Sequence, residues 1–251
     1  SLSNRHLQLI AIGGAIGTGL FMGSGKTISL AGPSILVIYM IIGFMVFLVM
    51  RALGELLLSN LNYKSFIDFS TDLIGPWAGY FVGWTYWLCW ITIGIADLSA
   101  IIYYLQFFNH GLPFTPLEGV MISVAAIIFI MGLNLVTVKL FGELEFWFAL
   151  IKIIAIVVLI GVGLWMIFTG FTSDTGHVAS FTHIWSHGGI FPTGAMGFLA
   201  GFQIAIFAFV GVELVGTTAA ETKDPEKNLP KAVNSIPIRI IIFYVLALLI
   251  V

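Results

Sequence analysis

Long apolar stretches recur along the whole chain and constrain its fold more than any other feature. About 20 predominantly apolar residues cross the hydrocarbon core of a bilayer as one helix, and seven stretches approach or exceed this length. They cover approximately residues 7–23, 32–50, 77–107, 119–136, 146–168, 197–217 and 236–251. The sequence therefore predicts an all-α integral membrane protein that crosses the bilayer several times.

Composition excludes the main alternative classes. Of the 251 residues, 59% are hydrophobic and 9% are charged, which is too little charge to cover the surface of a water-soluble core. A formal net charge of −2 supplies no basic face for nucleic acid. We also expect no nucleotide site, because the GKT string at residues 25–27 has Leu20 where a phosphate-binding loop needs its first glycine.

The loop between the fifth and sixth spans contains histidines that resemble a metal-binding pair. His183 and His187 are four residues apart, as two ligands on one helix face would be. The Ser and Gly residues around them favour a loop instead. We therefore expect solvated histidines and no metal.

The basic residues orient the chain, because loops rich in Lys and Arg are retained in the cytoplasm. If seven spans alternate, only Lys26 falls on the outer side and Lys152 falls near a span. The others share one side, namely Arg5, Arg51, Lys64, Lys139, Lys223, Lys227, Lys231 and Arg239. This arrangement predicts a cytoplasmic N-terminus, an outer loop over 170–193 and a cytoplasmic segment over 221–234. The amphipathic stretch 53–75 is expected to form an interfacial helix on the cytoplasmic side.

Two of the apolar stretches are interrupted by glycines. Residues 13–21 read GGAIGTGLF, and residues 207–216 read FAFVGVELVG. In the first, Gly13 and Gly17 either form a close-packing helix face or belong to an unwound stretch whose amides face an anionic ligand. Glycine-interrupted spans at corresponding places in two halves indicate a transporter site. The two spans enter from opposite sides, as an inverted repeat of five helices requires.

This reading divides the chain at residue 170. Residues 1–170 form the first five-helix repeat, and residues 171–251 hold the outer loop, the sixth span and a shortened seventh span. The final stretch is shorter than a full crossing, so the chain is expected to be a fragment of a longer protein.

Three ionisable residues fall within or beside apolar spans, where charge is costly and indicates a partner or a function. Lys152, near the start of the fifth span, either extends its ammonium to the interface or lies buried and exchanges a proton during transport. Asp97 lies in the middle of the third span, where a structural hydrogen bond to a neighbouring helix is expected. Glu213 lies inside the second interrupted stretch, and a structural or gating role is expected for it.

Five ordered segments resemble the amino acid permeases of the amino acid-polyamine-organocation superfamily. These are GGAIGTGLF at 13–21, RALGEL at 51–56, FGELEFWFALIKI at 141–153, FAFVGVE at 207–213 and ETKDPEKNLPKA at 221–232. The resemblance implies twelve spans in two inverted five-helix repeats plus two further helices, of which this chain covers about the first seven. It implies a transporter in the bacterial cytoplasmic membrane and not an enzyme.

The same resemblance implies proton-coupled uptake of small neutral amino acids such as glycine, D-alanine and D-serine, with no cofactor other than the coupling proton. Another neutral or aromatic substrate, or amino acid exchange on the same fold, remains open. Lys152 matches a fifth-span lysine that replaces a sodium ion in proton-coupled members.

The resemblance also assigns the residues that bind the substrate. The carboxylate would be bound by Gly17, Thr18 and Gly19, through backbone amides and the Thr18 hydroxyl. The ammonium would be bound by the carbonyls of Ala15, Phe207, Ala208 and Val210. The Phe207 ring matches an aromatic gate over the site.

Overall fold

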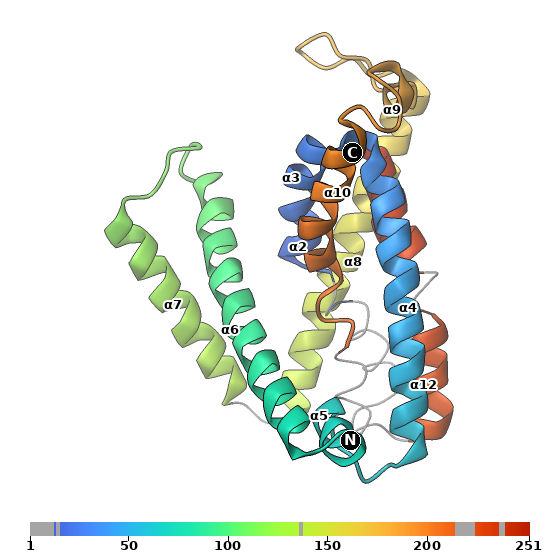
Figure 1. The fold of residues 1–251 in the computed structure, drawn as a ribbon. Helices are drawn as coiled ribbons and strands as arrows, with labels where there is room; N and C mark the ends of the chain where they lie inside the picture. Colours follow the sequence, from blue (N-terminus) through green and yellow to red (C-terminus); the bar gives the residue numbers. More distant parts are fainter. Residues whose placement is uncertain (1–12, 14–15, 136–137, 214–223, 236–238) are drawn as a thin grey trace. The chain divides into compact units, whose positions relative to one another are not determined.

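The computed structural model describes residues 13, 16–135, 138–213, 224–235 and 239–251 (Figure 1). Within these residues all regular elements are helices, apart from an isolated bridge between Thr172 and Val178. The chain forms two compact units, Ser1–Leu61 with Glu145–Val251, and Asn62–Leu144. Each unit is described separately.

Four of the described helices are apolar and long enough to cross a membrane, and two shorter apolar helices accompany them. The long ones are Thr18–Ser59, Pro76–Gln106, Pro116–Asn134 and Glu143–Thr169, and the shorter ones are Gly194–Phe209 and Ile240–Ile250. The first has 42 residues, or about 63 Å at 1.5 Å per residue, roughly twice the hydrocarbon thickness. It therefore includes the end of the first predicted span and the whole of the second. The prediction of an all-α multi-pass membrane protein is confirmed.

The first unit begins with two spans that extend beyond their predicted ends. Helices α2 (Thr18–Phe21) and α3 (Gly23–Ala31) are followed by the short 3-10 helix η1 (Gly32–Ser34) and by α4 (Ile35–Ser59). Gly32 has φ 59°, in the left-handed region that favours glycine, and Pro33 follows it. Because the chain changes direction only there, α3 continues to Ala31 instead of ending at the predicted residue 23.

Helix α10 (Gly194–Ala205) packs against α3 and α4 in the middle of this unit (Figure 1). The contact uses Gly197 and Gly201, four residues apart on one helix face. A Cβ atom on Gly201 would lie 2.6 Å from Ile38 Cδ1 and 3.0 Å from Ala31 Cβ. Small residues are needed here because lipid supplies no hydrophobic driving force between helices, so association depends on close packing.

The remaining helices of the first unit follow the predicted order. Helix α8 (Val138–Thr169) enters this unit at Glu145, and α10 continues into the 3-10 helix η2 (Ile206–Phe209). Beyond it lie α12 (Pro225–Asn234), which packs on α4, the π-helical η4 (Ile240–Val245) and α14 (Leu246–Ile250). The outer loop was expected to be irregular at its histidines, but His183–Ser186 forms the short helix α9.

The second unit consists of α5 (Phe66–Leu73), α6 (Pro76–Gln106) and α7 (Pro116–Asn134). A capping box between Ser65 and Asp68 begins α5. The predicted interfacial helix over 53–75 is therefore shorter in the structure, because residues up to Ser59 continue α4 and the chain turns before Ser65. Helices α6 and α7 lie side by side, as their predicted spans do in sequence (Figure 1).

The close contact at Gly201 predicts that added volume there destabilises the first unit. We expect Gly201→Val in the full-length protein to lower the apparent Tm in detergent by several degrees, because overpacking costs about 1–3 kcal/mol. Gly132→Val in α7 is the matched control, since no described atom lies within 4 Å of a Cβ atom at Gly132. An equal loss of thermal stability in both variants would contradict the packing role of Gly201.

Candidate functional site

The first span is broken immediately before α2. Ile16 and Gly17 form a bend, Gly17 has extended dihedrals (φ −156°, ψ −154°), and helical structure starts at Thr18. The N–H groups of Leu20 and Phe21 both donate to the Gly17 carbonyl over 3.1 Å. Amides that precede these in the first turn have no acceptor within the helix, and such amides commonly bind carboxylates. Thr18 and Gly19 occupy this first turn.

The glycines around this break have different surroundings. A Cβ atom on Gly13 would collide with the Ala149 side chain of α8, so this glycine permits close helix packing. No described atom lies within 4 Å of a Cβ atom at Gly17. The packing interpretation therefore holds at Gly13, whereas none of the described residues fills the space beside Gly17.

The sixth span is broken after α10. The helix tightens into η2, Val210 is extended (φ −65°, ψ 135°) and Gly211 has φ 103°, a conformation that side chains other than glycine rarely adopt. The N–H group of Gly211 donates to Oε2 of Glu213 over 2.8 Å. The intramembrane carboxylate predicted to need a partner thus binds backbone that the break has freed.

The two breaks meet backbone to backbone. A Cβ atom on Gly19 would lie 2.6 Å from the Ala208 N and Cα atoms and from the Phe207 carbonyl oxygen. The structure therefore brings the predicted carboxylate-binding turn against the predicted ammonium-binding segment. Ala15, the remaining predicted carbonyl, lies outside the described residues.

Lys152 joins α8 to the first break. Its Nζ atom donates to the Gly13 carbonyl over 3.0 Å, and the side chain is half-buried. Glu145, two helical turns earlier on α8, interacts electrostatically with Lys152. The sequence analysis does not predict this interaction, although the spacing of seven residues puts both side chains on one helix face.

Asp97 belongs to the other compact unit. It is half-buried in α6 and interacts electrostatically with Tyr104 of the same helix.

An aromatic cluster beside the sixth-span break was not predicted. The Phe209 ring lies 5.4 Å from the Tyr39 ring and 5.0 Å from the Tyr244 ring, and the two tyrosine rings are 5.9 Å apart. A tyrosine inside an apolar span is the signal that could have found it, since a buried phenol usually requires a hydrogen-bond partner.

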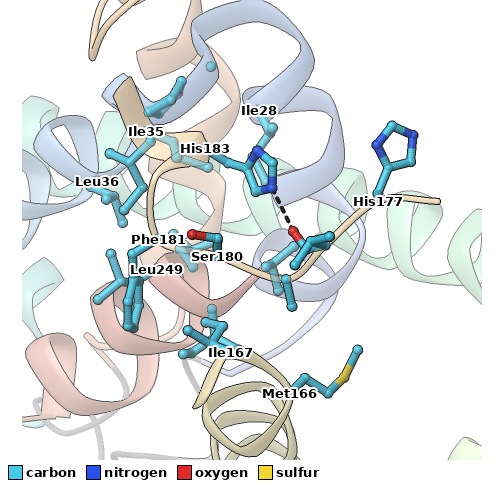
Figure 2. A pocket seen from close by; sticks show the side chains of 18 of the residues that line it. Ile28, Ile35, Leu36, Met166, Ile167, His177, Ser180, Phe181, His183 and Leu249 are labelled. Atoms are coloured by element: carbon cyan, nitrogen blue, oxygen red, sulfur yellow. Dashed lines mark hydrogen bonds between the residues drawn. The ribbon is translucent and has the colours of Figure 1, made fainter. Parts of the chain in front are cut away.

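A separate cavity lies elsewhere in the first unit. It has a volume of about 400 Å³. Figure 2 shows it between aliphatic side chains and the outer loop, where His183 Nε2 lies 2.8 Å from the Val178 carbonyl oxygen. The predicted substrate residues within the described part of the chain do not line this cavity. The candidate site is consequently the junction of the two breaks and not this cavity.

Comparison with known proteins agrees with this architecture. The family model for amino acid permeases matches residues 6–251. The D-serine/D-alanine/glycine transporter of Escherichia coli (strain K12) is 68% identical over 251 residues, which are 100% of this chain and 52% of the relative. The amino-acid permease AapA of Bacillus subtilis (strain 168) is 56% identical over 250 residues, 100% of this chain and 53% of the relative.

A relative with another named substrate class also matches. The aromatic amino acid transport protein AroP of Shigella flexneri is 45% identical over 246 residues, 97% of this chain and 52% of the relative. The chain thus spans about half the length of the curated relatives that it matches. Because the family model covers nearly the whole chain and includes both broken spans, the chain belongs to the amino acid permease family.

Proposed function

We propose that the full-length protein takes up small neutral amino acids together with a proton, with glycine, D-alanine and D-serine as substrates. Alternating access across the bacterial cytoplasmic membrane, with the N-terminus in the cytoplasm, is the mechanism proposed. The name of the Escherichia coli relative supports the choice of substrates. The hydrogen bond from Lys152 to the Gly13 carbonyl carries the proposal of proton coupling.

The junction of the two breaks suits a zwitterion. Amides of the turn that begins at Thr18 would bind the carboxylate, and the carbonyls of Ala15, Phe207 and Val210 would bind the ammonium. The Ala208 carbonyl, assigned to the same end by the resemblance, is buried and accepts a hydrogen bond from Tyr244. Both substrate charges are then solvated by backbone dipoles and need no formal protein charge. Among the described residues nothing fills the space beside Gly17, which leaves room at the carboxylate end.

The proposal of proton coupling rests on the backbone carbonyl to which Lys152 donates its hydrogen bond. A charged ammonium holds the Gly13 carbonyl more strongly than a neutral amine does, because charge-assisted hydrogen bonds are the stronger kind. Loss of the proton would weaken the link between α8 and the first break. Such a change couples to substrate only if the two access states differ in their affinity for substrate, and the substrate turn lies only a few residues from Gly13.

The sequence similarity to AroP, an aromatic amino acid transport protein, makes aromatic amino acids the second candidate substrate class. A competition panel with the full-length protein in proteoliposomes separates the two. We expect unlabelled glycine, D-alanine and D-serine to reduce labelled glycine uptake, and phenylalanine and tryptophan to leave it unchanged. Inhibition by the aromatic amino acids alone would indicate that aromatic amino acids, and not small neutral ones, are the substrates.

Coupling through Lys152 predicts that Lys152→Met abolishes uptake of labelled glycine against its gradient, because the residue that changes charge is lost. Lys26→Met is the matched control, since Lys26 is an exposed lysine of α3, and we expect it to accumulate substrate normally. A protonophore should collapse uptake by the unmodified protein, and removal of sodium should not. Normal accumulation by Lys152→Met would remove this lysine from the mechanism, and proton-independent counterflow would indicate an exchanger.

The open space at Gly17 predicts a binding defect without a folding defect. We expect Gly17→Ala to raise the KM for glycine, since the added methyl group occupies the space beside the carboxylate-binding turn, while leaving the apparent Tm unchanged. Gly25→Ala in α3 is the control, because a Cβ atom there also meets no described atom within 4 Å. An unchanged KM in Gly17→Ala would place the substrate elsewhere.

A further inference from the structure

The sixth-span break exposes backbone groups that a continuous helix would have paired. Helix α10 ends at Ala205, and the next residues adopt 3-10 and then extended geometry. In hydrocarbon, each freed carbonyl must find a donor in the protein or in a water-lined site. The carbonyls of residues 206–210 that already accept a hydrogen bond within the protein therefore determine which ones are left to bind a substrate.

Two neighbouring carbonyls of this segment have different partners. The Phe207 oxygen faces Gly19 of the first span and accepts the Val210 N–H over 3.3 Å. The Ala208 oxygen accepts a hydrogen bond of 2.6 Å from the Tyr244 hydroxyl. Ala208 is 0% exposed and Tyr244 is 4% exposed, so the surrounding protein keeps solvent from this hydrogen bond.

The position of Tyr244 depends on unusual local geometry. It lies in η4, the π-helical turn Ile240–Val245. Such turns are rare and occur frequently at functional sites. Ile240, the first residue of the turn, packs against Gly43 of α4, where a Cβ atom would lie 2.7 Å from its Cγ2 atom. The Phe209 ring, whose centroid is 5.0 Å away, also contacts the Tyr244 ring.

We propose that Tyr244 is a positioning residue for the ammonium end of the substrate site, acting through the Ala208 carbonyl. Its hydroxyl fixes the peptide plane between Ala208 and Phe209, which in turn fixes the direction of the Phe207 carbonyl one residue earlier. The substrate ammonium then meets a preorganised acceptor instead of a segment that must reorient on binding. This inference rests on the proposed function for the location of the substrate.

Tyr39 supplies a matched contrast within the same cluster. It is 0% exposed, and its ring lies 5.4 Å from Phe209 and 5.9 Å from Tyr244. Its hydroxyl has no hydrogen-bond partner among the described residues. Removing that hydroxyl deletes the same atom from the same environment without releasing the Ala208 carbonyl.

The test compares Tyr244→Phe with Tyr39→Phe in the full-length protein. In Tyr244→Phe we expect the KM for glycine to rise roughly two- to ten-fold, which is the fold-change equivalent of one lost neutral hydrogen bond, with a smaller change in maximal rate per folded molecule. Tyr39→Phe should leave both parameters unchanged. Equal kinetic effects in the two variants would overturn the inference, because they would reflect general loss of the cluster.

Hydrogen exchange of purified protein provides a readout that does not depend on substrate. Peptides that cover residues 206–212 should exchange faster in Tyr244→Phe than in Tyr39→Phe, because the freed carbonyl loosens the break. Equal exchange rates in this segment would overturn the inference even if glycine is transported. Faster exchange in a protein that transports no glycine would instead uphold the positioning of Ala208 while the proposed function fails.

Replacement of Tyr244 by p-aminophenylalanine covers the case in which Tyr244→Phe does not fold. The aniline N–H can donate to the Ala208 carbonyl as the phenol does, so we expect a near-normal KM and near-normal exchange. O-methyltyrosine at the same position cannot donate and should reproduce the defect. Equal behaviour of these two replacements would show that the donor is unimportant and would overturn the inference.

Discussion

The close approach of Gly19 to the Ala208 backbone is the contact on which the rest of the site depends. It places two interrupted helices against each other in a part of the protein where backbone groups cannot rely on water. Three polar side chains then bond backbone groups near the interruptions. Lys152 bonds the Gly13 carbonyl, Glu213 bonds the Gly211 N–H and Tyr244 bonds the Ala208 carbonyl.

These three contacts give a common physical reason for polar residues inside the spans. Each of these polar side chains would be costly in lipid if it had no partner. Each forms a hydrogen bond with a backbone group near an interruption. The hydrogen bond that stabilises a break can therefore also control it. Any change in the side chain changes the freedom of the backbone group to which it is hydrogen-bonded. In the proposed function, protonation of Lys152 is such a change in a side chain.

Sequence reasoning located the breaks but not everything that supports them. The glycine strings at 13–21 and 207–216 predict both interruptions, and the position of Lys152 beside an apolar span predicts a partner or a function for it, although not that the partner is the Gly13 carbonyl. Tyr39 and Tyr244 were not predicted, because the apolar runs around them suggest ordinary spans and the π-helical turn has no simple residue signature. Helix ends were also missed where apolar and polar residues both suit a helix, as at residues 51–59 of α4.

The π-helical turn also affects how this region can change in evolution. Each residue advances an α-helix by about 100°, whereas the π-helical turn Ile240–Val245 holds one residue more than an α-helical turn would. Loss of one residue inside this turn would convert it to α-helix and leave the residues on either side in their present orientation. Loss of one residue elsewhere in the span would instead rotate every later side chain by about 100° relative to those before it, so the turn is the part of this span in which a deletion disturbs the flanking helix least.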